Sequence, residues 1–354
     1  MQKGKHFYLG ANTPEGFFSY YNNLAGYDRV NRIYCIKGGP GSGKSTFMKN
    51  IASHMEKEGM NVEYVHCSSD DSSLDAIYIK DIKTAFLDGT APHITDPKYP
   101  GAVDEIINLG TFWKKDSLIP LRKDIIHVSD IISCHFDRAY DYLGAVKKFY
   151  ANTDKIYKKH CNRYLQNSFI DDILFEELAE FPLTDYIGKK RKLFATAITP
   201  SGFRNRLDTV FGSVKVYNLS GYTDDLLLRL SDFITERGID VEMYFCPLNP
   251  TKKCEHLLIP DLKLGFSLSN DYHSINMGER VDLSIDDSIP QEDMEYIDFN
   301  RKTTDYIFKK VFSELELAKK NHDILEDYYK KCMDFDAVEE LSLGYAKEIL
   351  EKIS

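Results

Sequence analysis

The sequence repeats itself at an offset of about 180 residues, which restricts it to folds built from two similar halves. The letters TPEGF at 13–17 return as TPSGF at 199–203, and GMNVE at 59–63 returns as GIDVE at 238–242. A stripe of apolar residues spaced three or four apart over 128–150 returns over 307–329, broken only by His322. The repeat predicts two domains, 1–185 and 186–354, whose boundary lies near the proline and glycine of residues 181–188.

Both halves have the same predicted order of elements. A short strand and a loop are followed by strand, turn and helix, then by further strands and finally by long helices. Strands that alternate with helices are typical of parallel βαβ units, so we expect an α/β fold of two tandem P-loop-NTPase-like cores with parallel sheets. The amphipathic tails at about 120–180 and 300–352 predict a helical arm of long paired helices after each core.

Residues 38–45 of the first half read GGPGSGKS, which fits the phosphate-binding pattern G-x-x-x-x-G-K-[ST]. An apolar strand at 33–36 precedes this P-loop, and an apolar helical stripe from Phe47 to Met55 follows it. Glycines let the backbone curl its N–H groups around a phosphate, and the helix points its positive end at the same anion. The predicted nucleoside triphosphate site consists of Gly38, Gly39, Pro40, Gly41, Ser42, Gly43, Lys44, Ser45 and Thr46.

A magnesium ion is expected beside the P-loop. The Ser45 hydroxyl is a hard oxygen ligand, and Asp88, which ends the apolar segment 84–87, is predicted to hold the ion through water. Asp70 and Asp71 follow the strand predicted at 62–66, where a carboxylate base for an acceptor hydroxyl or water would act together with Lys44. Loop carboxylates are more often only solvated, and that alternative stays open.

The second half tests these predictions, because it repeats the fold without the motif. Only the four residues YTDD at 222–225 stand where the first half has eight, and no Gly-Lys-Ser remains. Leu268 takes the place of Asp88, whereas the apolar helix positions stay apolar. We therefore expect a single nucleotide site, in the first half. His93 has a counterpart, His273, in the half that lacks the P-loop, which favours a structural role for both.

Composition restricts the partners. A formal net charge of −10 argues against nucleic-acid binding, and the basic run KKRK at 189–192 is expected to be a solvated linker. Neither a signal peptide nor an apolar run long enough to span a membrane is expected. Seven scattered cysteines without a C-x-x-C pair suit a reducing cytoplasm, are expected to be small buried residues, and argue against disulfides and a zinc site.

Several further segments accompany the P-loop: GANTPEG at 10–16, HCSSD at 66–70, DGTAPH at 88–93, DPKYPGA at 96–102 and ATAITP at 195–200. With them the whole chain resembles a bacterial family of uncharacterised duplicated P-loop ATPase-like proteins. The resemblance implies the tandem fold and ATP binding. Members of that family often carry a second Gly-x-Pro-Gly-x-Gly-Lys-Ser loop, which this sequence lacks, so a second site does not carry over.

Two functions fit these features. The first is an enzyme, an Mg-ATP-dependent hydrolase or phosphotransferase with an unidentified acceptor. The alternative is a non-catalytic ATP-dependent switch or scaffold that binds a protein partner through its helical arms. ATP is favoured over GTP because the sequence has no Asn-Lys-x-Asp signature, and no Leu-Ser-Gly-Gly-type signature suggests a transporter ATPase. No glutamate follows Asp88, so slow turnover or phosphoryl transfer fits better than AAA- or RecA-type hydrolysis.

Overall fold

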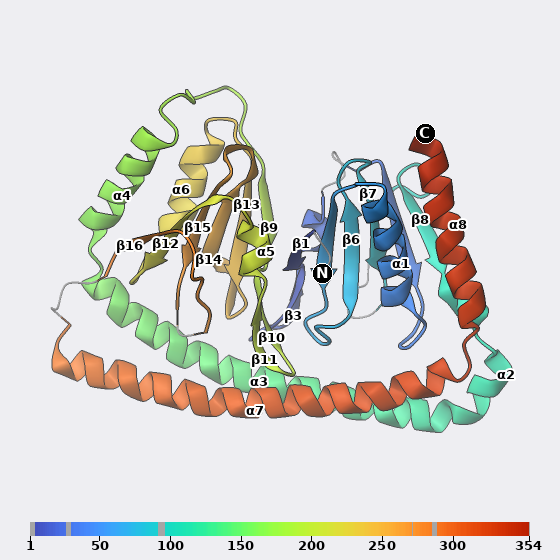
Figure 1. Cartoon of the computed structure of the whole chain (residues 1–354). Coiled ribbons are helices and arrows are strands. Elements are labelled where there is room, and N and C mark those ends of the chain that lie inside the picture. The colour runs from blue at the N-terminus through green and yellow to red at the C-terminus, as the bar shows by residue number, and fades with distance from the viewer. Residues whose placement is uncertain (1–3, 26–29, 91–95, 271, 285–288, 354) are drawn as a thin grey trace.

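The short apolar segments of each half pair into one six-stranded sheet, and the two sheets stand beside each other above two long helices (Figure 1). The computed structural model describes residues 4–25, 30–90, 96–270, 272–284 and 289–353. Within them the protein is α/β, as the sequence predicts.

The strands of the first sheet have the order β1-β5-β6-β7-β4-β8. Their bounds are β1 (Lys5–Tyr8), β4 (Arg32–Lys37), β5 (Val62–His66), β6 (Leu74–Ile79), β7 (Thr84–Asp88) and β8 (Asp104–Asn108). The second sheet has the order β9-β13-β14-β15-β12-β16 when read from the corresponding edge. Its strands are β9 (Lys190–Leu193), β12 (Lys215–Ser220), β13 (Val241–Cys246), β14 (Asn249–Ile259), β15 (Leu264–Leu268) and β16 (Glu279–Asp282).

Both sheets are mixed, so the prediction of wholly parallel sheets is wrong. β6 and its counterpart β14 run antiparallel to both of their neighbours, while the remaining pairs are parallel. The connections explain this. β5 ends at His66 and β6 begins at Leu74, which is too short for the crossover of a dozen or more residues that a parallel pair needs. A connection this short joins the two strands as an antiparallel hairpin.

The repeated TPxGF segments form matching hairpins, β2 (Gly10–Thr13) with β3 (Gly16–Ser19) and β10 (Thr196–Thr199) with β11 (Gly202–Asn205). The turns need glycine, because φ is +97° at Gly16 and +98° at Gly202.

The described helices are α1 (Lys44–Lys57), α2 (Lys115–Leu118), α3 (Arg122–His160), α4 (Arg163–Glu176), α5 (Leu207–Phe211), α6 (Leu226–Thr235), α7 (Gln291–Lys330) and α8 (Phe335–Ile353), with 3-10 turns η1 (Tyr21–Asn23), η3 (Leu109–Phe112), η4 (Ile119–Leu121) and η5 (Pro260–Leu262).

The two long helices, α3 and α7, lie antiparallel along the base of the molecule (Figure 1). Their repeated apolar stripes face each other, and Leu143 and Val146 of α3 are buried with Val311 and Leu315 of α7. The long helices therefore pair between the halves rather than within each half. None of the described helices combines the length and the apolar composition that a membrane crossing requires.

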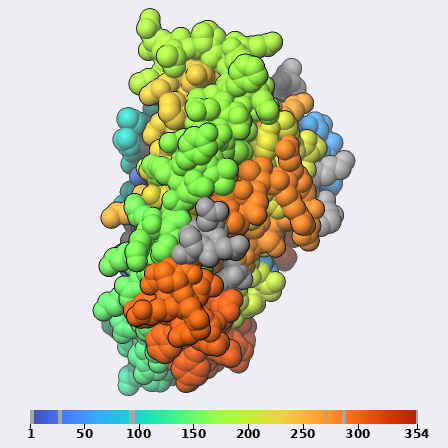
Figure 2. All heavy atoms as spheres, turned by 90° about the vertical axis from the view of Figure 1, so that its left-hand side faces the viewer, coloured from blue at the N-terminus to red at the C-terminus, as the bar shows by residue number. Residues whose placement is uncertain are grey.

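Each helical arm ends on the sheet of the other half. Phe169 of α4 packs on Phe266 of the second sheet, and Figure 2 shows the green α4 on the outer face of the molecule. Tyr345 of α8 packs in turn on Tyr34 and Phe47 of the first sheet and α1. Length explains the crossing, because a helix of 39 residues, such as α3, spans about 58 Å, whereas six strands span about 24 Å. Each long helix therefore extends beyond the sheet of its own half.

The sheets meet at their β1 and β9 edges. Tyr8 and Phe194 exchange reciprocal backbone hydrogen bonds of 2.8 and 2.9 Å. Below them, Arg191 of β9 lies 2.8 Å from the Glu63 carboxylate and 2.9 Å from Glu242. Burial opposes ionisation of Glu63, but Arg191 and Lys5 outweigh it and hold the pKa of that carboxyl below its usual range. The prediction of a solvated linker at 189–192 is therefore wrong: the basic run is an edge strand that joins the halves.

The seven cysteines form no disulfide in the described chain. Cys35, Cys246, Cys254 and Cys332 are buried, as predicted, whereas Cys67 and Cys161 are partly buried and Cys134 is exposed on α3.

Candidate functional site

A glycine-rich loop, residues 38–45, connects β4 to α1 at the end of the first sheet. Gly41 and Gly43 adopt φ values of +66° and +88°, a region that suits glycine and that curls the backbone toward the start of α1. Phe47, Met48 and Ile51 fix that helix by burying its apolar face on the sheet. The loop and the first turn of α1 thus have the local geometry that anion-binding backbone amides require.

Lys44 and Asp88 lie together at this loop. β7 is the parallel neighbour of β4, and the register places Asp88 opposite Ile36, just before the loop. The Lys44 ammonium donates to the Gly38 and Gly39 carbonyls at 2.7 and 3.0 Å and lies 3.5 Å from the Asp88 carboxylate. The structure therefore brings together the lysine and the aspartate that the sequence singles out.

The three hydroxyl side chains of the loop and of the start of α1 differ in burial and in hydrogen bonding. The Ser42 hydroxyl is buried and donates to the Gly39 carbonyl at 2.8 Å, so it braces the loop. Ser45 is partly buried, and its hydroxyl accepts from the Leu74 amide at 3.0 Å, while a lone pair remains for a cation. Thr46 is exposed on the first turn of α1. Ser45 and Asp88 are the oxygen donors suited to a hard divalent ion here.

The corner between α7 and α8, residues 326–338, covers the loop from the other half of the chain. A side-chain carbon added at Gly41 would lie 2.8 Å from the Glu326 carbonyl oxygen. One added at Gly43 would lie 3.6 Å from both Phe335 and Val338. The sequence does not predict that this corner packs over the loop, because an apolar helix stripe does not identify the surface on which it packs.

The corresponding turn of the second half, residues 221–225, is covered in the same way by the corner between α3 and α4. Asp225 pairs with Arg163 at 2.7 Å, Asp224 pairs with Lys158 at 3.1 Å, and the Tyr222 carbonyl accepts from Gln166 at 3.0 Å. Each strand–turn–helix unit is thus capped by a helical corner. In the second half the cap and the turn are joined by ion pairs.

Asp70 and Asp71 follow β5, as expected, but both are tied to distant parts of the chain. The Asp71 carboxylate accepts from the Tyr8 hydroxyl and from Arg206 of the second half, each at 2.6 Å. Asp70 accepts from Ser72 and lies 3.4 Å from Lys319 of α7. Burial opposes ionisation of Asp70, but its contacts with Ser72 and Lys319 lower the pKa of its carboxyl. A lower pKa makes Asp70 a weaker base. His93 lies outside the described residues.

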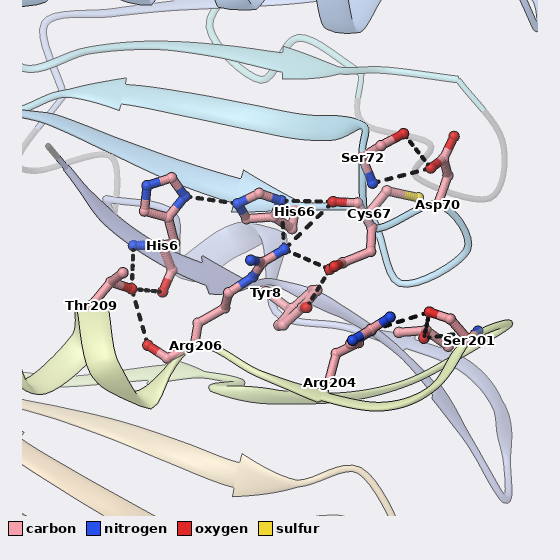
Figure 3. Close-up of polar contacts among 12 residues, drawn as sticks. His6, Tyr8, His66, Cys67, Asp70, Ser72, Ser201, Arg204, Arg206 and Thr209 are labelled. Carbon is pink, nitrogen blue, oxygen red and sulfur yellow. Dashed lines mark hydrogen bonds and ion pairs between the residues drawn. The ribbon is translucent and has the colours of Figure 1, made fainter. Parts of the chain in front are cut away.

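A buried histidine pair adjoins Asp71 (Figure 3). His6 Nδ1 lies 2.8 Å from His66 Nε2, and Arg206 lies 3.2 Å from the other His66 nitrogen. Burial, the charge of Arg206 and the nearby His6 lower the pKa of His66 to about 4. The ring is therefore neutral at pH 7 and belongs to the junction between the halves. The sequence offered no signal for this junction, because its members are far apart along the chain.

Comparison with known proteins finds similarity over only part of the chain. The Nephrocystin 3, N-terminal family model matches residues 19–83. This segment includes the glycine-rich loop, α1, Asp70 and Asp71, and it ends before Asp88. No curated protein and no solved structure matches the chain.

Proposed function

We propose that the chain is an Mg-ATP-binding P-loop protein with one nucleotide site, at residues 38–46. The observation that carries this proposal is the strand–loop–helix unit in which two left-handed glycines curl the loop and Lys44 lies 3.5 Å from Asp88. A cation and a carboxylate at the mouth of such a loop are the groups that a nucleoside triphosphate and its metal ion require. The resemblance to duplicated P-loop ATPase-like proteins supports the same proposal.

Each residue has a distinct role in this proposal. The loop amides and the α1 N-terminus bind the phosphates, and Lys44 exchanges its carbonyl partners for the β- and γ-phosphates. Ser45 and Asp88 would hold a magnesium ion, which when bound would supply positive charge to the phosphoryl oxygens. The proposed site can therefore support hydrolysis or phosphoryl transfer.

Asp70 and Asp71 remain the proposed carboxylate bases, although each is engaged elsewhere. Asp71 shares its carboxylate with Tyr8 and Arg206, and Asp70 accepts from Ser72 and lies 3.4 Å from Lys319. Steady-state release of phosphate from Mg-ATP, with and without candidate acceptors, tests the enzyme. Turnover that persists unchanged in Lys44→Ala would refute it.

A second candidate, an ATP-dependent switch, is favoured by the helical corner over the loop. Residues 326–338 belong to the second half, yet they contact Gly41 and Gly43, where a triphosphate is proposed to bind. Bound nucleotide would then alter how α7 and α8 pack. Hydrogen exchange of segment 326–345 with and without Mg-ATP tests this: a switch changes exchange in the wild type and not in Lys44→Ala. Turnover without any change in exchange would favour the enzyme alone.

A further inference from the structure

Two buried histidines and a glutamate come together in the second half, away from the glycine-rich loop. Glu255 and His256 lie on β14, and His273 follows β15; their side-chain exposure is small, with 2%, 1% and 8% of each residue accessible. One ligand atom from each of the three lies within 4.8 Å of the others. Buried charged and imidazole groups are rare unless they are paired or bind a metal ion.

One nitrogen of His256 has no partner. Nδ1 lies 2.9 Å from the Ser267 hydroxyl, whereas Nε2 is buried and makes no hydrogen bond. If Nδ1–H donates to Ser267, the lone pair of Nε2 stays available for a metal ion, and a second hydrogen bond of this kind commonly orients a metal-binding imidazole.

Comparison with the first half shows that the fold does not need His256, whereas Glu255 and His273 correspond in the sequence repeat to Asp75 and His93. His256 and Ser267 are cross-strand partners in the second sheet, and the equivalent pair in the first sheet is Ala76 and Leu87. Both first-sheet residues are buried and apolar. A buried polar pair with an unsatisfied nitrogen is therefore a specific feature of the second half, rather than a requirement of this strand order.

The Asn270 amide lies 3.2 Å from Glu255 and 3.4 Å from His273, so these two side chains share a polar neighbour beside His256. Glu255 and His273 approach to 3.9 Å, too far apart for a hydrogen bond. Ligands around a tetrahedral zinc ion lie about 3.3 Å apart, given zinc–nitrogen and zinc–oxygen distances of about 2.0–2.1 Å, so small side-chain shifts would close the site. A cavity of about 20 Å³, lined in part by Glu255, Tyr272 and His273, leaves room for a water as a fourth ligand.

We propose that Glu255, His256 and His273 bind a divalent transition-metal ion of the zinc class. Two imidazole nitrogens and one carboxylate suit zinc and its neighbours, whereas magnesium and calcium prefer sites made only of oxygen. This site is independent of the proposed nucleotide site, and it needs no cysteine ligand.

The test uses the full chain after removal of metal by a chelator and dialysis. Zn²⁺ content by elemental analysis and the visible bands of added Co²⁺ report stoichiometry and geometry. We expect one ion per chain with the strong visible absorption of four-coordinate cobalt. The double variant His256→Ala/Ser267→Leu, which installs the first-half pair, should fold, as judged by its thermal unfolding, and should bind Co²⁺ at least about 100-fold more weakly.

Two further variants keep the test decisive. His322→Ala alters a second, partly exposed His-Asp-Glu group, on α7, and should leave Co²⁺ binding unchanged. Glu255→Gln preserves shape and should weaken binding if the double variant fails to fold. Binding that survives in the double variant or in Glu255→Gln, binding lost in His322→Ala, or no stoichiometric ion in the wild type would overturn the proposal. Lys44→Ala should not alter the cobalt bands, so failure of the nucleotide proposal would be seen separately.

Discussion

Lys44 has three partners in the structure: the Gly38 and Gly39 carbonyls and the Asp88 carboxylate. The lysine thus braces the loop, and under the proposed function it would exchange its carbonyl partners for phosphate oxygens. The ammonium makes charge-assisted hydrogen bonds, worth about 1.5–3 kcal/mol, to either kind of acceptor, but only a phosphate adds the attraction of an opposite charge. This difference is the physical basis of the first prediction.

Lys44→Ala should weaken ATP binding by about 30- to 150-fold, the equivalent of about 2–3 kcal/mol. Lys49→Ala is the matched control, because Lys49 lies on the same helix but its ammonium donates to the Ser72 carbonyl, away from the loop. Calorimetric titration with Mg-ATP measures both variants. Equal affinities of the two variants would contradict the assignment of Lys44.

Asp88→Asn should weaken binding of Mg-ATP more than binding of ATP in the presence of a chelator. The amide keeps the shape of the side chain, and it removes the charge that would hold the metal ion. The measurement is ATP affinity at a series of Mg²⁺ concentrations. If the variant responds to Mg²⁺ as the wild type does, Asp70 or Asp71 holds the ion instead.

The free energy of unfolding should fall as the pH falls from 6.5 to about 4. The unfolded chain binds a proton at His66 near pH 6.5, whereas the folded chain, with the pKa of His66 at about 4, does not. The unfolded state therefore binds more protons in this window, and each pH unit costs up to about 1.4 kcal/mol. His66→Gln should show a smaller difference in urea-unfolding free energy between pH 4.5 and pH 7. An equal difference in variant and wild type would argue against His66.

At the scale of elements, the sequence predicts which segments are helices but not what they contact. The stripes at 128–150 and 307–329 identify α3 and α7 correctly, because a period near 3.6 is a local property. Their pairing with each other, and the packing of α4 and α8 on opposite sheets, depend on the length of the helices and on distant surfaces. The antiparallel direction of β6 and β14 does not follow from the alternation of strands and helices, because it depends on the short connections on either side of these strands.

The contact between the α7–α8 corner and the loop can be measured with two glycines. Gly41 and Gly59 both have positive φ, but only Gly41 lies against the Glu326 backbone, and nothing lies within 4 Å of a carbon added at Gly59. Gly59→Ala should cost about 1 kcal/mol of unfolding free energy, from the left-handed backbone alone. Gly41→Ala should cost about 1–3 kcal/mol more, because it also displaces the corner. Equal losses in urea titrations would indicate that the corner does not press on the loop.

At the scale of the whole molecule, the sequence repeat reappears as two sheets with the same strand order. The charges that join the sheets were not predictable, because Lys5, Arg191, Glu63 and Glu242 come from four separate strands. The Lys44–Asp88 pair was predictable, because one residue belongs to a local motif and both are missing from the second half. Local motifs and internal comparison thus identify the candidate site, while contacts between the halves require the structure.

The difference between the two turns predicts one bound nucleotide per chain. The first half has a loop of eight residues with left-handed glycines, whereas the second has a short turn whose carboxylates already pair with Lys158 and Arg163 of the α3–α4 corner. A triphosphate at the second turn would have to displace those cations and would face two like charges, which opposes binding. Calorimetry with Mg-ATP should therefore saturate at one nucleotide, and Lys44→Ala should weaken that single event. A second nucleotide-binding event would place a nucleotide in the second half if it were stronger in Asp224→Asn/Asp225→Asn and unchanged in Lys44→Ala.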